Sequence, residues 1–180
     1  TGEGSFAKVV SAVELLPTDY ILKPFTADNM LERIARAVDK RAAFMPVHEL
    51  IDVGNERGAI AACGEGASLY PRYATDFLRL RAELYLLLGE AAEAEPIYAS
   101  LYDAKAIGWA RLGQAKTLFQ QGDYPAAQAM LEELLDNNKR FLDAYDWLAR
   151  THQAQGHPQE AQHALAEAVV AACERPRAFA

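Results

Sequence analysis

The sequence has little of what marks disulfide-rich, membrane or nucleic-acid-binding proteins. Its 180 residues include only two cysteines, Cys63 and Cys173, which are too few and too far apart for a disulfide framework or a zinc site. No run approaches the roughly 20 apolar residues of a membrane helix, and no signal peptide opens the chain. Lys and Arg form no cluster or stripe, so phosphate neutralisation on nucleic acid is not expected. We therefore predict a cytoplasmic protein with reduced thiols that binds neither nucleic acid nor membrane.

Residues that carry catalysis are also missing in any recognisable arrangement. The four histidines show no metal-ligand spacing, and no Ser/His/Asp or Cys/His set falls on one predicted face. Gly64-Glu65-Gly66 resembles part of a phosphate loop, but it follows no strand and precedes no Lys-Ser or Lys-Thr pair. Glu132, Glu133 and Asp136 are interpreted as a solvated helix surface. The sequence therefore predicts that the chain is not an enzyme and holds no cofactor or metal.

Charge is unevenly distributed along the chain. Residues 1–45 contain equal numbers of basic and acidic residues, so the net charge of −7 falls entirely on residues 46–180. The same point separates two kinds of hydrophobic pattern, and we predict two domains, residues 1–45 and residues 46–180. With 51% hydrophobic and 24% charged residues, the chain has the composition of a globular protein that buries a core.

Residues 1–45 are interpreted as a helix, one strand and a second helix. Apolar residues at helical spacing predict a helix over Ser5–Leu16, and Tyr20–Leu22 has the character of a short strand that Pro24 ends. Thr26 is suited to cap the second helix. The predicted inward face of that helix comprises Met30, Leu31, Ile34, Ala35 and Val38. Because a lone strand is not stable, the segment is expected to be the end of a larger α/β domain.

This segment resembles the C-terminal third of a response-regulator receiver domain, over about residues 1–40. Thr1 stands where the family has a Ser or Thr closing its fourth strand, and Tyr20 where it has a switch aromatic. Lys23-Pro24 matches the Lys-Pro pair that follows. The resemblance implies that Lys23 pairs with a phosphorylated aspartate, that Thr1 hydrogen-bonds the phosphoryl group, and that Tyr20 changes rotamer with it.

The same resemblance limits what this chain does alone. The family's phosphoacceptor aspartate and its acidic metal-binding pair lie upstream of residue 1, so magnesium and a cognate histidine kinase are expected only for an intact parent protein. The strand has no neighbours within the segment, which leaves its edge and the apolar faces of the flanking helices uncovered. Residues 1–40 are therefore expected to pack against a second copy, giving a homodimer, or onto the rest of the chain.

A glycine followed five residues later by an alanine recurs through the second region. The pairs are Gly89 and Ala94, Gly122 and Ala127, and Gly156 and Ala161, at a period of 33 to 34 residues. Such a period is typical of stacked helical hairpins. Glycine takes the backbone angles of the turn, and the small alanine lets the second helix lie close to the first.

These turns predict three helical hairpins and an imperfect leading one. The first helices are expected at Tyr73–Leu88, Lys105–Gln121 and Leu142–Gln155. Their partner helices are expected at Ala91–Tyr102, Tyr124–Asn137 and Pro158–Cys173. Upstream, Pro46 is suited to the first turn of a new helix. Two shorter patterns follow it, Val47–Val53 and Gly58–Leu69, and form the imperfect hairpin because glycines weaken both.

The period and the small-residue positions resemble the tetratricopeptide repeat family over residues 46–174, with about three repeats plus a partial leading one. The early Trp-Leu-Gly-Tyr positions of the family match loosely, and its late proline is absent from the clear repeats. The resemblance implies a mainly α fold, a right-handed array of antiparallel helical hairpins preceded by the helix-strand-helix remnant. Arrays of this family generally bind a peptide or a partner helix along the face made by the first helices.

The positions on that face predict where a protein or peptide partner binds. They are Asp76, Arg79 and Glu83, then Trp109, Leu112, Lys116 and Phe119, then Asp143, Asp146 and Arg150. Trp109, Leu112 and Phe119 form an apolar centre flanked by charges, which is the make-up of an interaction hot spot. The alternative interpretation is that Trp109 and Phe119 pack between adjacent hairpins.

Two functions follow from these patterns. The leading hypothesis is a fragment of a two-component response regulator, in which a phosphoaspartate receiver controls a repeat module that binds a protein. The predicted helix Thr26–Lys40 would couple the two parts. The alternative is a constitutive scaffold or assembly chaperone in which the receiver remnant is merely structural.

Overall fold

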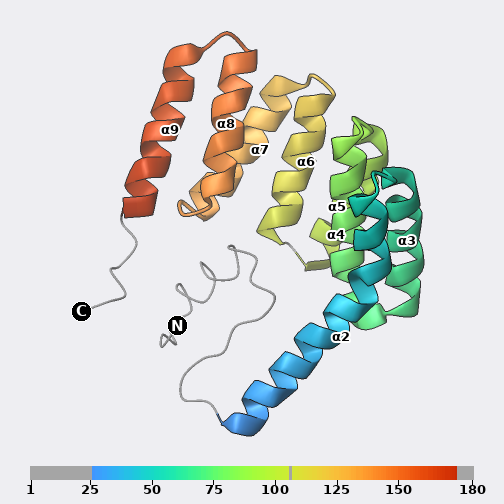
Figure 1. Ribbon diagram of the computed structural model, residues 1–180. Coiled ribbons are helices and arrows are strands. Elements are labelled where there is room, and N and C mark those ends of the chain that lie inside the picture. Colours follow the sequence, from blue (N-terminus) through green and yellow to red (C-terminus); the bar gives the residue numbers. More distant parts are fainter. Residues whose placement is uncertain (1–25, 106, 174–180) are drawn as a thin grey trace. The chain divides into compact units, whose positions relative to one another are not determined.

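The protein is helical wherever its structure is described. The computed structural model describes residues 26–105 and 107–173, and these residues contain eight α-helices, one short 3₁₀ helix and no strand (Figure 1). The elements are α2 (Ala27–Asp52), α3 (Glu56–Leu69), η1 (Pro71–Tyr73), α4 (Ala74–Leu87), α5 (Ala91–Lys105), α6 (Gly108–Gln120), α7 (Tyr124–Asn137), α8 (Leu142–Ala154) and α9 (Pro158–Cys173). None of the helices in this part of the chain is long and apolar enough to cross a membrane.

The helices predicted for the three clear hairpins are confirmed. α7 and α9 have the predicted bounds, and the ends of α4, α5 and α8 differ from the prediction by one to three residues. α6 begins at Gly108 rather than at Lys105. The reason is that α5 continues through Lys105 and that Ile107, just before α6, has an extended backbone.

The first region is described only from Thr26 onward. The predicted helix Ser5–Leu16 and the predicted strand Tyr20–Leu22 lie outside the described residues, so no receiver remnant is shown. Thr26 caps α2 as predicted, because its side-chain oxygen accepts a hydrogen bond from the backbone N–H of Asn29 at 3.2 Å.

The N-terminal half of α2 exposes the apolar face that was predicted to turn inward. Met30, Leu31, Ile34 and Val38 are 38%, 60%, 50% and 60% exposed, and Ala35 is exposed as well. The buried residues of α2 lie further along, at Ala43, Phe44 and Val47. This face is therefore uncovered in the described residues, as the sequence predicts for a helix that has lost its neighbours. The part of α2 that is buried is its second half, where the chain then turns back into α3.

α2 runs without a break through Pro46, where the sequence predicted the start of a new helix. A proline in a helix interior removes one backbone donor and costs about 3 kcal/mol. Phe44 and Val47, on either side of Pro46, are both buried, and we attribute the continuity of the helix to their packing. The predicted helix start is wrong, and the predicted domain boundary between residues 45 and 46 falls inside one helix.

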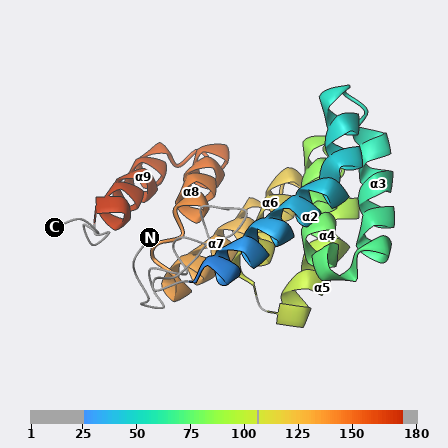
Figure 2. The same ribbon diagram turned by 60° about the horizontal axis from the view of Figure 1, so that its bottom comes forward.

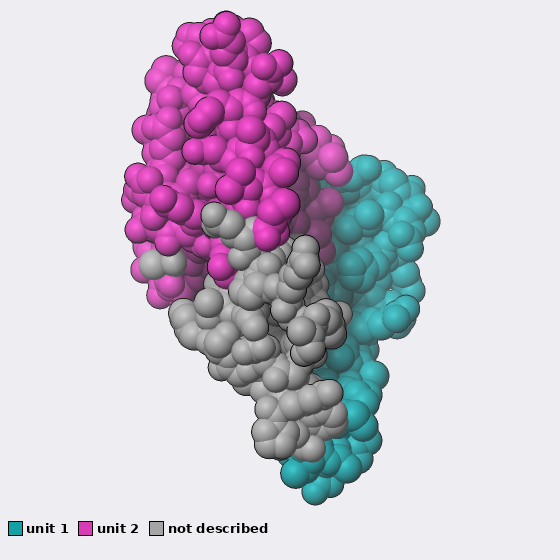
Figure 3. Space-filling model, turned by 90° about the vertical axis from the view of Figure 1, so that its left-hand side faces the viewer, with its two compact units in different colours: residues 1–74 teal, residues 75–180 magenta. Residues whose placement is uncertain are grey.

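The chain divides into two compact units, residues 1–74 and residues 75–180 (Figure 3). In the first unit α2 packs against α3, and the hydroxyl of Tyr73 donates a hydrogen bond to the carbonyl oxygen of Arg36 at 3.3 Å. In the second unit each helix from α5 to α9 packs against the next one along the chain (Figure 2). α6 also contacts α8, so the first helices of these two hairpins are neighbours.

Each hairpin turn is built on a glycine with a positive φ angle. Gly89, Gly122 and Gly156 have φ angles of 76°, 82° and 81°, as the repeat predicts, and Gly54 has a φ angle of 72°. In all four turns the glycine N–H donates to the carbonyl three residues back, and the next N–H donates to the carbonyl five residues back, at 2.8–3.1 Å. This pair of hydrogen bonds is the Schellman motif, which ends a helix in the left-handed region that glycine adopts without strain.

The alanine five residues after each glycine is buried in every hairpin. Ala59, Ala94 and Ala127 are 0% exposed and Ala161 is 1% exposed. Because Ala59 follows Gly54 at this spacing, the hairpin of α2 and α3 has the same construction as the other three. The leading hairpin therefore contains a fourth copy of the glycine turn that the sequence predicts for the three later hairpins.

Gly113 is a sensitive position where α6 packs against α5. A Cβ atom added to Gly113 would lie 2.3 Å from Cδ1 and Cε1 of Tyr98, whose ring is buried on α5. We expect Gly113→Ala to lower the free energy of unfolding by about 1–3 kcal/mol, the usual result of overpacking a closed site. Urea unfolding followed by circular dichroism measures the change.

The matched control is Gly108→Ala in the same helix. There the nearest side-chain atom, Cε1 of Phe141, is 3.6 Å from the added Cβ, an ordinary contact distance. The control is expected to leave the free energy of unfolding unchanged or slightly raised, since alanine is the better helix former. Equal losses for the two variants would contradict the overpacking against Tyr98, because only Gly113 lies close to that ring.

Candidate functional site

The helices α4, α6 and α8 bring together most of the residues predicted to contact a partner. The guanidinium carbon of Arg79 on α4 lies 4.6 Å from the ring centroid of Trp109 on α6. Nε of the same guanidinium donates a hydrogen bond to Oε1 of Glu83 at 2.9 Å. Arg79 is therefore held by both an aromatic face and a carboxylate.

Trp147 on α8 is an aromatic residue of this surface that the sequence prediction left out. The ammonium of Lys116 lies 5.3 Å from its ring centroid, and the guanidinium carbon of Arg150 lies 5.0 Å from it. Arg150 also pairs with Asp146 at 2.9 Å. The sequence contains a cue to Trp147, which follows Asp143 by four residues and precedes Arg150 by three, on the same helix face.

Lys116 on α6 interacts electrostatically with charged side chains of α4 and α8. Burial lowers the pKa of its ammonium, while the carboxylates of Glu83 and Asp143 oppose that shift and the cations of Arg79 and Arg150 add to it. Among the described residues this ammonium makes no hydrogen bond and no ion pair. We call the whole set the Lys116 cluster, and it comprises Arg79, Glu83, Trp109, Lys116, Asp143, Asp146, Trp147 and Arg150.

The other predicted contact residues lie outside this cluster. Leu112 is 4% exposed and belongs to the core, so its side chain is not part of the surface on which it was predicted. Phe119 lies against Tyr124 of α7, with ring centroids 5.2 Å apart, and meets Trp147 edge-on at 5.4 Å. Phe119 therefore packs between hairpins, as the alternative interpretation had it. Asp76 lies in the first turn of α4.

The receiver-like residues are not placed by the structure. Thr1, Tyr20, Lys23 and Pro24 all lie outside the described residues. Within residues 26–105 and 107–173, no group of three or more His, Cys, Asp and Glu side chains is placed to hold a metal ion.

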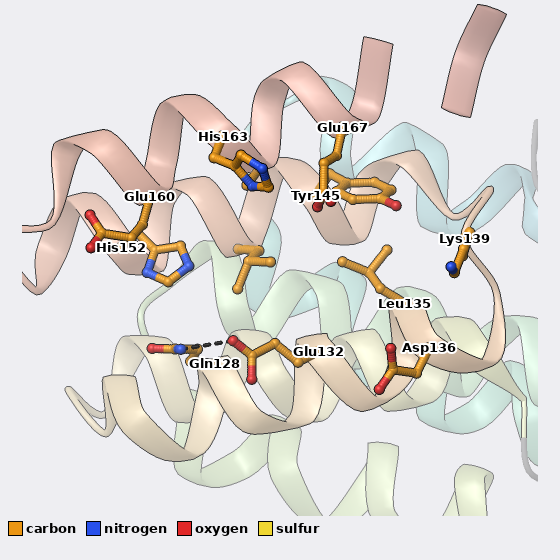
Figure 4. Close-up of a pocket in the computed structure, with 12 residues that line it drawn as sticks. Gln128, Glu132, Leu135, Asp136, Lys139, Tyr145, His152, Glu160, His163 and Glu167 are labelled. Atoms are coloured by element: carbon orange, nitrogen blue, oxygen red, sulfur yellow. Dashed lines mark hydrogen bonds between the residues drawn. The ribbon is translucent and has the colours of Figure 1, made fainter. Parts of the chain in front are cut away.

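A second candidate surface is a pocket of about 520 Å³ bounded by α7, α8 and α9. α7 and α9 form two of its sides, and α8 lies between them (Figure 4). The residues that line it are Gln128, Glu132, Leu135, Asp136, Lys139, Tyr145, Leu148, His152, Glu160, His163, Ala164 and Glu167. Glu132 and Asp136 are solvent-exposed, as the sequence predicts, but they also border this pocket.

Family models described as the tetratricopeptide repeat match residues 76–100 and residues 118–179. These two segments are therefore similar to tetratricopeptide repeats, and the described part of the fold that the sequence resemblance assigned to that family is an all-helical hairpin array. Neither match extends into residues 1–75, and the receiver domain predicted there is not shown. None of the curated proteins compared with the chain matches its sequence.

Several solved structures share this fold at low sequence identity. The TPR-like repeats of a putative kinesin light chain from Podosopora anserina superpose with a TM-score of 0.58 at 14% identity, over 95% of this chain and 97% of that one. YrrB, described as a TPR protein with an unusual peptide-binding site, has a TM-score of 0.56 at 13% identity, over 94% and 84%. MamA has a TM-score of 0.57 at 18% identity, over 69% and 73%. At these identities the likeness shows the fold alone.

The depressed pKa of Lys116 makes its effect on stability depend on pH. The folded protein releases this proton at a lower pH than the unfolded chain does, so the contribution of Lys116 to the free energy of unfolding is smallest below the folded pKa. It then rises with pH until the unfolded lysine titrates near about 10.4. We subtract the free energy of unfolding of Lys116→Met from that of the unsubstituted protein, and we expect this difference to increase as the pH rises toward about 10.4.

Taking the difference removes contributions from groups that both proteins share. Lys105→Met, which changes an exposed lysine on α5, is the matched control and is expected to give a difference that stays flat over the same range. Urea unfolding at a series of pH values measures both differences. A flat difference for Lys116→Met would contradict the burial of its ammonium.

Proposed function

We propose that this chain is a protein-interaction scaffold that holds a segment of a partner protein on the Lys116 cluster. Tetratricopeptide repeats support this proposal, because the family generally binds peptides or helices on the face made by the first helices. The peptide-binding site named for YrrB, a protein of the same fold, supports it as well. This proposal is the constitutive-scaffold alternative that the sequence offers, and it assigns the chain no catalytic reaction.

The observation that carries the proposal is the pairing of two tryptophans with cations from three helices. Trp109 and Trp147 are both partly buried, and the cations of Arg79, Lys116 and Arg150 lie over their rings. Tryptophan and arginine are the residue types most enriched among interface residues that dominate binding. A surface that presents both on rigid helices needs little reorganisation when a partner binds.

The free ammonium of Lys116 indicates the chemistry of the partner segment. Its burial is incomplete, and it has no anionic hydrogen-bond partner among the described residues. A carboxylate from the partner would supply that hydrogen bond, and an adjacent apolar side chain would lie against Trp147. We therefore propose a segment that places an acidic residue beside an apolar one.

Trp147→Ala tests the proposed surface. We expect it to weaken partner binding by roughly 30-fold, equivalent to about 2 kcal/mol, which is the usual effect of truncating a hot-spot tryptophan. Proteins retained by the immobilised chain from a lysate of the source cells identify the partner, and titration calorimetry with the purified partner then gives both dissociation constants.

Leu87→Ala serves as the matched control, because Leu87 is an apolar residue of α4 that is 72% exposed and lies outside the Lys116 cluster. It is expected to bind the partner like the unsubstituted chain. Circular dichroism checks that each variant is folded. If Trp147→Ala and Lys116→Met both kept full affinity for a partner that the chain does bind, the partner would lie elsewhere on the protein.

Receiver control of this binding is the second candidate function, and we propose it on one observation. The first half of α2 begins at the predicted cap Thr26 and leaves its apolar face exposed among the described residues. A helix cut from a larger domain, or one that joins a second copy of the chain, has this property. Under this proposal the parent protein is a cytoplasmic response regulator, served by a histidine kinase, with a homodimer formed through residues 1–40.

Lys23→Ala separates the two candidates when it is made in an intact parent protein that carries the phosphoacceptor aspartate and is phosphorylated there. A constitutive scaffold is expected to bind its partner with an affinity unchanged within about twofold, or about 0.4 kcal/mol. Titration calorimetry with the partner measures the change. A loss of affinity in Lys23→Ala, with Lys8→Ala unchanged as a control for removing a positive charge, would favour control through the receiver-like segment instead.

A further inference from the structure

The pocket between α7, α8 and α9 has a strongly acidic rim. Four carboxylates line it, from Glu132 and Asp136 on α7 and from Glu160 and Glu167 on α9. Lys139, in the turn after α7, supplies one ammonium. The rim therefore has an excess of negative charge, whereas the Lys116 cluster mixes both signs.

In the part of the chain that the structure describes, none of these carboxylates forms an ion pair. Glu132 accepts a hydrogen bond from the side-chain amide of Gln128 at 2.8 Å, but this donor is uncharged (Figure 4). The negative potential of the pocket is therefore open to a cation from outside.

The buried part of the pocket lining consists of three aliphatic side chains, one tyrosine and one histidine. Leu135 and Leu148 are buried and line it beneath the rim. Beside them His152 is 8% exposed, and its imidazole faces the space between α7 and α9 (Figure 4). Nδ1 of His152 has no hydrogen-bond partner within residues 26–105 and 107–173. A buried polar atom without a partner costs free energy, so this side chain marks a place where the protein alone is incompletely satisfied.

The pocket is separate from the Lys116 cluster. With about 100° of rotation per residue, Tyr145, Leu148 and His152 fall on one face of α8. Trp147 and Arg150 fall on the opposite face. The two surfaces therefore use the same helix from two sides, and a ligand of one does not contact the other.

We propose that this pocket binds an arginine side chain presented by a partner protein. Arginine combines an aliphatic stem, which would lie on Leu135 and Leu148, with a planar cation that donates five hydrogen bonds to surrounding carboxylates. The volume of about 520 Å³ falls in the range of ligand pockets and admits the residues that flank the arginine. A bare divalent cation fits less well, since the carboxylates and histidines of the described residues are not grouped as a metal site.

Fluorescence polarisation with the whole chain tests the proposal. The probe is a fluorescein-labelled peptide, Gly-Leu-Arg-Arg-Leu-Gly, and its matched partner carries citrulline in place of both arginines. Citrulline keeps the shape of the side chain and removes its charge. We expect the arginine peptide to bind and the citrulline peptide to bind at least about tenfold more weakly.

Paired variants locate the site. Glu160→Gln with Glu167→Gln removes two rim carboxylates and is expected to weaken binding of the arginine peptide by about tenfold or more. Glu93→Gln with Glu95→Gln on α5 is the matched control, because it changes net charge equally and because Glu93 and Glu160 both lie in the first turn of a second helix. All four side chains are exposed, so both double variants are expected to fold.

A second readout reports on the pocket itself. The imidazole resonances of His152 are expected to shift when the arginine peptide is added, while those of His48, exposed on α2, stay in place. Trp147→Ala is expected to bind the peptide unchanged, so failure of this proposal is distinguishable from failure of the partner surface on α4, α6 and α8. Equal losses in the two double variants, equal binding of the citrulline peptide, or no binding would overturn the proposal.

Discussion

The fold depends on four helix ends at which the backbone takes a positive φ angle. At each end a glycine closes the helix with two hydrogen bonds to its last turn, and the chain then enters the next helix antiparallel to the first. The alanine five residues later is buried at the crossing, so the axes approach as closely as a methyl group allows. Any other residue at the glycine is strained, and any larger one at the alanine separates the helices.

This constraint decides which faces of α8 are available for binding. α8 follows one such hairpin and begins the next, and it packs against both α7 and α9. Its alanines and Leu148 face the core, which leaves two polar edges. One edge carries Trp147, whose ring lies next to Lys116 of α6 and Arg150 of α8. The other edge carries His152 toward the pocket that the carboxylates of α7 and α9 line. A single helix thus contributes to two surfaces because the turns fix its rotation.

The sequence predicted the helices and turns, which depend on local residue spacing. It did not predict the surfaces at which side chains from different helices come close together. The three later hairpins follow from glycine and alanine positions alone, and α7 and α9 have the predicted bounds. The same spacing at Gly54 and Ala59 is harder to recognise in the sequence. Pro46 and the glycines between residues 54 and 66 indicate broken helices there. Leu112 was assigned to the surface because helical periodicity gives a face only to within a residue or so. The pocket has no local pattern, since its residues come from three helices.

The distribution of charge on these two surfaces gives each a different basis for selectivity. In the Lys116 cluster, Arg79 and Arg150 already pair with carboxylates, so among the described residues of the cluster the ammonium of Lys116 is the cation left for an anionic group of the partner. Such a site discriminates between partner segments by their shape and by the position of one charged side chain. At the pocket the carboxylates of Asp136, Glu160 and Glu167 form no ion pair among the described residues, so a cation gains attraction without breaking an existing pair. Binding at the pocket is therefore expected to weaken more steeply with ionic strength than binding at the cluster.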